Sequence, residues 1–205
     1  AAVGASNILG REALQDLWLP MAHVFGKMLV VIPIQIGFPT AVDGRIDKIV
    51  DNLAVVKPTF MGAAPRIFEK AYGRIKMMME EEGGVKLKLF NWASDVGKQV
   101  SVLREQGKSP SALLSLQHGL SDKIIGAKIR DRFGGRVRFF ISGSAALNQD
   151  ISRWFDAMGM QIAEGYGMTE TSPASTVNRI VAYKNGTVGW PLPGMEFRIA
   201  EDGEV

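Results

Sequence analysis

The sequence predicts an α/β fold in which a parallel sheet is flanked by helices. An apolar strand over residues 136–142 is followed by a helical stretch at 148–158, which Asn148 is expected to cap, and by a second strand at 160–163. A further apolar strand at 58–61 runs into a helical pattern that starts at Pro65. Strands that alternate with helices in this way are typical of parallel sheets joined by crossover helices.

The first part of the chain is apolar but contains no predicted membrane span. Residues 14–38 begin with a short apolar segment, which is followed by a Pro-Met-Ala-His turn. A buried helix or strand is expected after the turn. The most apolar run, residues 28–38, is shorter than the roughly 20 apolar residues that a span needs. The first residues also lack the charged and apolar regions of a secretory signal. Asp43 is expected to cap a short helix over 44–52.

Helical patterns dominate the middle of the chain. The pattern over 66–82 follows Pro65, which suits a first helical position, and it ends at two glycines. Further helical patterns cover 85–106 and 121–133. Residues 66–135 together are expected to form a helical insertion, and residues 66–136 carry a local charge of about +6.

The last 33 residues differ in composition from the rest of the chain, because glycine and proline are frequent in them. Residues 196–200 and the turn at Asp202 and Gly203 are typical of antiparallel strands. We therefore expect an α/β unit over residues 1–172 and the start of a β-barrel-like subdomain over 173–205. Because the chain opens without Met and stops within a β pattern, we expect it to be an internal piece of a longer protein.

The composition is that of an ordinary globular protein and excludes several kinds of chemistry. Of the 205 residues, 46% are apolar and 22% are charged. The chain has no cysteine, which excludes thiol nucleophiles, thiolate metal sites and disulfides, and fits a reducing compartment. The net charge of +3 is too small to indicate a polyanion partner.

Two short motifs follow predicted strands. Small residues at 142–146 lie between a strand and a helix, where ligands of parallel sheets bind and free N–H groups favour anions. Close packing of strand and helix explains this motif equally well. The second motif, Glu164-Gly165-Tyr166-Gly167-Met168-Thr169-Glu170, combines a glycine turn, an aromatic ring that can stack on a purine, a hydroxyl, and a carboxylate. These groups suit a nucleotide with its phosphate and Mg²⁺, although a solvated glycine-rich loop is the simpler alternative.

The second motif resembles the signature of the adenylate-forming superfamily, which includes acyl-CoA synthetases and peptide-synthetase adenylation domains. Other segments resemble the family's motifs in order and spacing across essentially the whole chain. They are Pro20 to His23, Lys57-Pro58-Thr59 with Pro65, the turn at Gly143 to Ala146, and Gly186 to Gly194. The long helical stretch and the sequence around Ser142 resemble the long-chain fatty acid-CoA ligases of bacteria. The residues themselves are similar to those of actinobacterial enzymes. Ser144 and Ala146 depart from the wider family's Gly and Pro.

The resemblance implies a role for each matching residue. Gly143, Ser144 and Ala145 would line the adenine, Tyr166 would stack on it, and Glu164, Gly165, Gly167 and Met168 would shape the loop. Thr169 would contact the α-phosphate, and Glu170 would coordinate Mg²⁺. His23 would lie near the acyl carboxylate and the phosphate; without the resemblance, a capping or core histidine is the better interpretation. The substrates would be ATP, a long-chain fatty acid and CoA. The expected location is the cytoplasm.

The sequence lacks several of the family's catalytic parts. It contains no phosphate loop ending in Lys-Gly and no Tyr-x-Thr-Gly-Asp ribose motif, and we expect the catalytic C-terminal domain to be absent as well. The isolated chain is therefore predicted to be inactive. Alternatives remain for the parent. It could be a fatty acyl-AMP ligase that uses a carrier protein, or a non-enzymatic module that binds anionic membranes or nucleic acid. Peripheral membrane contact is expected more than nucleic-acid binding, since exposed aromatic residues do not interleave with the basic ones. Residues 29–38 and the helix after Pro65 are candidates for lining an acyl tunnel, although core packing is the better interpretation for any single residue there.

Overall fold

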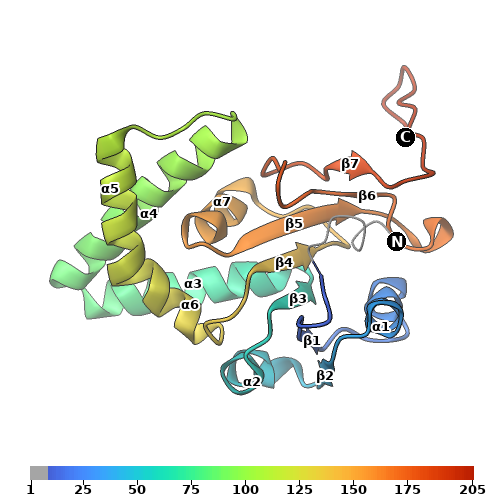
Figure 1. The fold of residues 1–205 in the computed structure, drawn as a ribbon, viewed down its shortest axis with the longest axis horizontal. Coiled ribbons are helices and arrows are strands. Elements are labelled where there is room, and N and C mark those ends of the chain that lie inside the picture. Colours follow the sequence, from blue (N-terminus) through green and yellow to red (C-terminus); the bar gives the residue numbers. More distant parts are fainter. Residues whose placement is uncertain (1–8) are drawn as a thin grey trace.

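The computed structural model describes residues 9–205 and confirms the α/β fold. Its described strands form one seven-stranded sheet in the order β2-β1-β3-β4-β5-β6-β7. The strands up to β5 are parallel, and β6 and β7 are antiparallel additions at one edge. The strands are β1 (Gln15–Leu17), β2 (Thr40–Val42), β3 (Phe60–Ala63), β4 (Phe139–Ser142), β5 (Gln161–Tyr166), β6 (Thr176–Val177) and β7 (Trp190–Pro191) (Figure 1).

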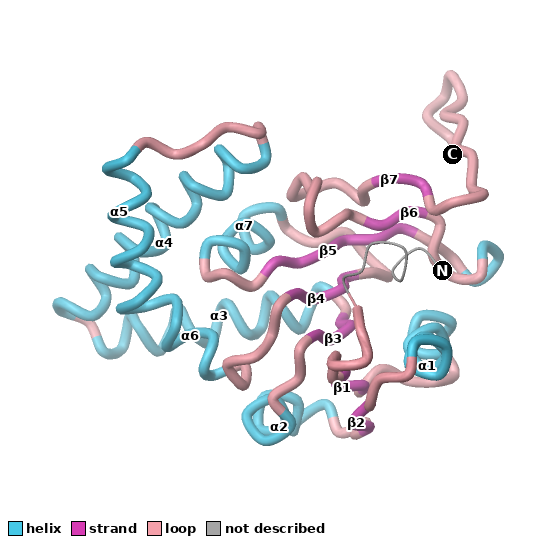
Figure 2. Tube along the Cα trace, in the orientation of Figure 1, coloured by secondary structure: helices cyan, strands magenta, loops and turns pink. Residues whose placement is uncertain are grey.

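Helices pack on both faces of the sheet (Figure 2). They are α1 (Val24–Ile36), α2 (Ile49–Val56), α3 (Pro65–Glu82), α4 (Gly84–Glu105), α5 (Ala112–Ser121), α6 (Ala127–Arg132) and α7 (Gln149–Ala157), with short 3₁₀ turns at Ile46–Lys48 and Thr169–Thr171 and a π-helical segment at Asp122–Gly126. Side chains from α1 pack on the face formed by Phe60, Phe139 and Ile141. Side chains from α2, α3, α4, α6 and α7 pack on the opposite face, so the sheet separates two cores.

The larger core is built on aromatic side chains. The Phe155 ring is fully buried and lies edge-on to the rings of Phe68, Phe133, Phe140 and Trp154. Edge-to-face pairs of this kind contribute beyond their buried area. The buried Trp154 indole also donates a hydrogen bond of 3.1 Å to the Ser94 hydroxyl on α4. The aromatic cluster therefore fixes α7, and the turns on either side of it, against the sheet.

The helices α3, α4 and α7 follow the predicted pattern. The patterns over 66–82 and 85–106 are α3 and α4, with Pro65 at the start of α3 as expected. Asn148 caps α7, since its side-chain oxygen accepts from the backbone N–H groups of Asp150 and Ile151. The open alternative for residues 28–38 is decided in favour of a helix, α1, which ends at a left-handed Gly37.

Two helix predictions have the wrong bounds. The helix predicted at 121–133 begins earlier, as α5, because the Ser111 hydroxyl accepts from Leu114 N–H and caps a helix that starts at Ala112. The helix predicted at 44–52 starts as a 3₁₀ turn at Ile46 and continues to Val56. Asp43 does not cap it, because its carboxylate accepts from Arg45 and from the Asn52 amide instead.

The C-terminal segment contains less β-structure than predicted. No strand forms over residues 196–200, although Asp202 closes the expected turn by accepting from Glu204 N–H. The antiparallel strands lie earlier, at β6 and β7, where they extend the sheet from β5. The division into two subdomains stays a prediction. None of the helices between residues 9 and 205 is long and apolar enough to cross a bilayer.

Asp16 is a buried carboxyl group on β1, between β2 and β3 in the sheet. It is 2% exposed, and one of its carboxyl oxygens is buried without a hydrogen-bond partner. Burial, with a smaller contribution from the Asp43 charge, raises the pKa of Asp16 from 3.8 to about 6. Burial of a carboxyl group disfavours its charged form, so Asp16 keeps its proton in the fold at pH values where the unfolded chain has released it.

We expect the free energy of unfolding to fall between about pH 4 and pH 6 because of Asp16. In this window the folded state binds a proton that the unfolded state has lost, so rising pH favours unfolding, by about 3 kcal/mol in total. Asp43 does not offset this, because its Arg45 partner holds its pKa below the window. Asp16→Asn should flatten the fall in urea titrations across this range. An equal fall in Asp16→Asn would contradict the assignment.

Candidate functional site

The two predicted motifs lie at the same edge of the sheet. β4 and β5 are parallel neighbours, with Ser142 paired to Glu164, so their carboxyl ends lie side by side. The turn after β4 holds Gly143, Ser144 and Ala145, and the end of β5 holds Gly165 and Tyr166. A Cβ on Gly143 would lie 3.8 Å from the Gly165 carbonyl oxygen. The register of one strand pair thus brings together two segments about 20 residues apart in the sequence.

Glu164 is buried and holds this edge together. Its carboxylate accepts hydrogen bonds of 3.3 Å from the backbone N–H groups of Leu147 and Gly186. Burial raises the pKa of Glu164, and the two N–H donors act in the opposite direction. The side chain therefore connects β5 to the turn after β4 and to the chain before β7. It acts on the loop from within the protein rather than from the surface of the site.

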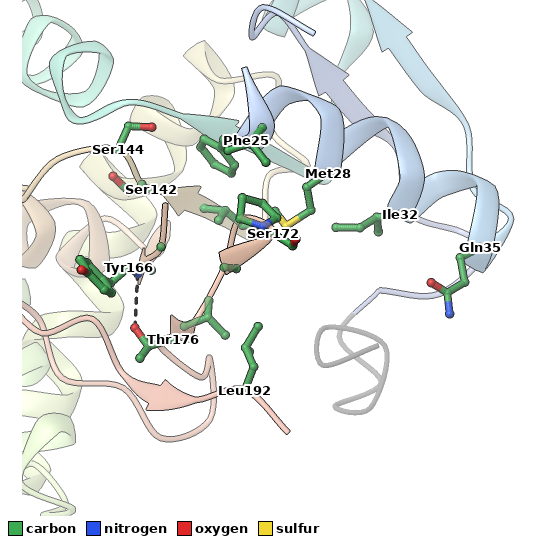
Figure 3. A pocket seen from close by; sticks show the side chains of 18 of the residues that line it. Phe25, Met28, Ile32, Gln35, Ser142, Ser144, Tyr166, Ser172, Thr176 and Leu192 are labelled. Carbon is green, nitrogen blue, oxygen red and sulfur yellow. Dashed lines mark hydrogen bonds between the residues drawn. The ribbon is translucent and has the colours of Figure 1, made fainter. Parts of the chain in front are cut away.

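Tyr166 lies at the mouth of a cavity with its ring partly exposed. Tyr166 is 38% exposed. Its backbone is fixed on both sides, because Tyr166 N–H donates to the Thr176 hydroxyl and its carbonyl accepts from Ser175 N–H. An aromatic ring on a rigid strand end, open on one side, is available for stacking (Figure 3).

The cavity next to Tyr166 has a volume of about 570 Å³ and a mostly apolar wall. One face of α1 forms much of the wall through Phe25, Met28 and Ile32, with Gln35 one turn further on. Figure 3 shows Ser144 and Tyr166 at one end of the lining and Gln35 at the other. The opposite wall comes from the strand ends and from the chain that returns after Tyr166, including Pro173 and Thr176. The cavity thus extends from the glycine turns along the helix.

The predicted tunnel residues are only partly those that line the cavity. Ile32, Gln35 and Ile36 of the predicted stretch 29–38 line it, whereas Leu29 is turned into the protein against Gly62. No residue of α3, the helix after Pro65, contributes to this wall. Sequence reasoning missed Phe25 and Met28. Phe25 precedes Ile32 by seven residues and Met28 precedes it by four, and this spacing is the signal that could have identified one helical face.

Ser144 adopts a backbone conformation that glycine favours. Its φ of 73° places it in the left-handed region, which costs a residue with a Cβ roughly 1–2 kcal/mol. The side chain is exposed and lines the cavity. Strain of this kind is retained where surrounding contacts determine the backbone, often at functional sites. Ala145 follows it, exposed, on the way to the buried Leu147.

Thr169, Glu170 and His23 lie beside the cavity but do not line it. Thr169 and Glu170 belong to the exposed 3₁₀ turn after Met168, where Thr171 rather than Thr169 closes the turn by hydrogen bonding to Met168. His23 precedes α1, is exposed, and makes no side-chain capping bond. It is two residues from Phe25 in the cavity wall. His118 lies on α5, away from this edge.

Comparison with protein families shows which family the chain belongs to. A family profile described as "AMP-binding enzyme" matches residues 7–205. The chain belongs to the AMP-binding enzyme family. The match covers all of the described residues, so both glycine turns and α1 lie within the matched region.

Individual members of the AMP-binding family are also similar to the chain. It is 32% identical over 92% of its length to a long-chain-fatty-acid–CoA ligase, FadD15, of Mycobacterium bovis, of which it covers 31%. It is 32% identical to the peroxisomal long chain acyl-CoA synthetase 6 of Arabidopsis thaliana, over 92% of this chain and 26% of the plant protein. The chain therefore spans about a third of the length of these curated relatives.

The fold is also found in solved structures. The N-terminal domain of FACL13 from Mycobacterium tuberculosis aligns with a TM-score of 0.59 over 100% of this chain and 41% of that domain, at 15% sequence identity. Such low identity is evidence for a common fold alone. Together with the family match, it confirms the predicted membership of the adenylate-forming superfamily.

We expect Gly167→Ala to destabilise the turn, because a Cβ at this position would overlap the carbonyl group of Pro173. To remove this overlap, the backbone at Pro173 would have to move. Overpacking of this kind costs about 1–3 kcal/mol of folding free energy. Urea unfolding would measure the loss. Gly119→Ala on α5 is the matched control, since nothing lies within 4 Å of its added Cβ and alanine favours a helix. Equal stability of the two variants would show that the close approach at Gly167 is not a constraint.

Proposed function

We propose that the parent protein is an ATP-dependent long-chain fatty acid–CoA ligase, in which this chain forms part of the adenylate and acyl sites. The observation that carries the proposal is the continuity between the glycine turns and the apolar cavity, since Ser144 and Tyr166 border both. A nucleotide at the turns and an apolar chain along α1 would place a carboxylate where the two meet. The names of the similar bacterial and plant proteins support the same substrates.

The proposed reaction has two steps. A carboxylate oxygen of the fatty acid attacks the α-phosphorus of ATP, the bond to the β-phosphate bridge breaks, and pyrophosphate leaves. The thiol of CoA then attacks the acyl carbon, loses its proton, and releases AMP as the thioester forms. A site of this kind works by positioning and by neutralising charge. In the proposed arrangement, Gly143, Ser144 and Ala145 border the adenine and the Tyr166 ring stacks on it.

The polar residues after Tyr166 are proposed to handle the phosphate. The Thr169 hydroxyl donates to an α-phosphate oxygen, and the exposed His23 orients the acyl carboxylate from the start of α1. Glu164, Gly165, Gly167 and Met168 keep the loop in shape. These roles rest on the family resemblance and on the exposure of the side chains beside the cavity.

The donor atoms present suit Mg²⁺ bound together with a substrate. The Glu170 carboxylate and Thr169 hydroxyl are exposed oxygen ligands beside the cavity mouth. Residues 9–205 contain no cluster of three or more acidic or histidine ligands that could hold a metal ion by itself. Mg²⁺ commonly binds through one or two carboxylates, waters and substrate phosphates, so Glu170 fits as such a ligand. When bound, the ion would neutralise phosphate charge.

CoA is the preferred acceptor, with a carrier protein as the alternative. The similar proteins with CoA ligase or acyl-CoA synthetase names favour CoA, and so does the long helical insertion of α3 to α6. Thioester formation by the full-length parent, offered CoA and an acyl carrier protein in parallel, separates the two. Product on the carrier alone would identify a fatty acyl-AMP ligase.

Tyr166 provides the direct test of the nucleotide site. We expect Tyr166→Ala to weaken AMP binding by roughly 5- to 150-fold, because a base stacked on an aromatic ring contributes about 1–3 kcal/mol. Tyr166→Phe keeps the ring and should bind normally. Isothermal titration with AMP and a non-hydrolysable acyl-adenylate analogue would measure both, on the full-length parent and on this chain. Unchanged affinity in Tyr166→Ala would refute the stacking role.

The isolated chain is predicted to bind nucleotide weakly and to form no acyl-CoA. It spans about a third of the similar ligases, and its sequence lacks the phosphate loop and ribose motifs of the resemblance. A thioester assay with ATP, Mg²⁺, palmitate and CoA would measure the yield. Any turnover above that of a heat-denatured control would contradict this prediction.

We further propose a cytoplasmic protein with peripheral membrane contact through α5. Leu113, Leu116 and Leu120 recur at helical spacing on α5 and are all more than half exposed. No acidic residue occurs between Glu105 and Asp122, whereas Lys108 and Lys123 flank the helix. An apolar stripe with basic flanks suits the surface of an anionic bilayer.

We expect the chain to sediment with phosphatidylglycerol-containing vesicles and to be partly released by salt. Replacing Leu113, Leu116 and Leu120 by Ser should reduce binding several-fold. A triple Ser variant at Val55, Val181 and Ile199, which are exposed elsewhere, is the control. Equal binding by both triple variants would exclude α5 as the contact. A gel shift with DNA but no vesicle binding would favour the nucleic-acid alternative.

A further inference from the structure

A second cavity lies within the helical layer, on the opposite side of the sheet from α1. It has a volume of about 270 Å³ and is enclosed by α3, α4, the π-helical segment and α6. These helices gather on the left of Figure 1, away from α1. None of its lining residues lines the cavity beside Tyr166. It therefore needs an explanation separate from the proposed adenylate and acyl sites.

The floor of this second cavity is entirely apolar. Ile75, Phe90 and Ile129 are buried beneath it, and Met78, Met79, Leu89, Ile124 and Ile125 form its sides. These side chains offer no strong hydrogen-bond donor or acceptor, so a polar ligand would lose its hydration without compensation. Methionine side chains are flexible and polarizable, and they adapt to apolar ligands of varied shape. The floor is thus suited to a hydrocarbon tail.

The rim of the cavity is basic. Lys86, Lys128 and Arg132 border it, against the single carboxylate of Glu82. Glu82 is paired with Lys86 at 2.9 Å. Lys128 has no ion pair within the described part of the chain, and the only side-chain hydrogen bond found there for Arg132 is a contact of 3.6 Å to the Met78 sulfur. Neither Lys128 nor Arg132 therefore forms an ion pair among the described residues, although the pKa of Glu82 is lowered mainly by Lys86 and also by the Arg132 charge.

The wall between floor and rim includes an irregular helical segment. Ile124 and Ile125 belong to the π-helix Asp122–Gly126, between α5 and α6. The segment is anchored by the bidentate pairing of Arg130 with Asp122, while Arg130 also donates to the Met158 carbonyl. Single-turn π segments are uncommon and frequently accompany functional sites. Here the extra residue turns two isoleucines into the cavity next to Lys128.

We propose that this second cavity binds one molecule of a single-chain anionic amphiphile, with its hydrocarbon tail on the apolar floor and its anionic head between Lys128 and Arg132. The arrangement of charges decides against a neutral lipid, since the unpaired cations would gain nothing from it. The apolar floor decides against a nucleotide or a simple inorganic anion. The inference is independent of the proposed adenylate site, because the two sites share no residue.

Methionine methyl groups can locate the binding site directly. With [¹³C]methyl-methionine labelling, Met78 and Met79 report on the second cavity and Met28 reports on the first. Single Met→Leu variants assign the three signals. Titration of the 205-residue chain with decanoate, below its aggregation concentration, should shift the Met78 and Met79 signals saturably. Shifts of Met28 alone would place decanoate only in the first cavity and overturn the proposal.

The anionic head is tested by charge reversal at the rim. Lys128→Glu with Arg132→Glu should raise the dissociation constant for decanoate at the second cavity at least about tenfold, as expected for the loss of charged hydrogen bonds. Decanol has the same tail without the charge, so its binding should be weaker and insensitive to this variant. Lys88→Glu with Lys123→Glu is the matched control, since both lysines are exposed outside the cavity.

The possible outcomes separate the parts of the proposal. Equal decanoate affinity in the rim variant and the control would overturn the assignment of an anionic head. The larger side chain of Ile125→Trp should fill the second cavity, so that decanoate no longer shifts the Met78 and Met79 signals. The substitution itself should not move the Met28 signal. If Ile125→Trp does not fold, the charge-reversal pair and the comparison of decanoate with decanol decide the question on a folded protein. Failure of this proposal would leave AMP binding at Tyr166 unaffected.

Discussion

The buried carboxylate of Glu164 is the interaction on which this edge of the molecule depends. It follows from the pairing of β4 and β5, which places Glu164 beside Ser142 at the carboxyl ends of both strands. From there it binds the N–H groups of Leu147 and Gly186, one on each side of the sheet edge. A buried carboxylate is costly unless hydrogen bonded, so the two N–H groups and the carboxylate hold each other in place.

Close backbone contacts extend this arrangement to the cavity wall. Gly165 approaches the Thr176 carbonyl so closely that a Cβ would lie 2.9 Å from it, and Gly167 approaches Pro173 more closely still. The chain after Tyr166 can therefore return along β5 as β6 and close one side of the cavity. The Tyr166 ring remains outside this contact, partly exposed. A fixed backbone with a free ring is what a stacking site requires.

The sheet gives the protein two unlike cavities. On one face, a single helix, α1, leaves a long apolar wall beside the glycine turns. On the other face, the helices α3 to α6 pack around an aromatic core and leave a smaller cavity under a basic rim. The second cavity is lined by helical residues alone, and it shares no residue with the first. Ligands in the two places would consequently be recognised by independent sets of groups.

Local patterns in the sequence determined much of the architecture. The apolar periodicity of α3 and α4, the Asn148 cap, and the small residues at the strand ends each depend on neighbours within a few residues, and these predictions agree with the structure. The motif around Tyr166 was sufficient to indicate the family. The Ser111 cap shows the limit of this reasoning, because a Gly- and Pro-containing segment before it obscured the start of α5.

Only the tertiary structure decided which residues face one another. Glu164 matched a loop motif in the sequence, but its role as an internal tie depends on Leu147 and Gly186, which lie 17 and 22 residues away. The cavity along Phe25 and Met28 forms only when α1 is laid beside strand ends more than 100 residues later in the chain. The second cavity requires three α-helices and a π-helical turn. The sequence determines where the chain bends and which side chains are apolar, whereas packing between distant segments determines which of those side chains are left facing an open space.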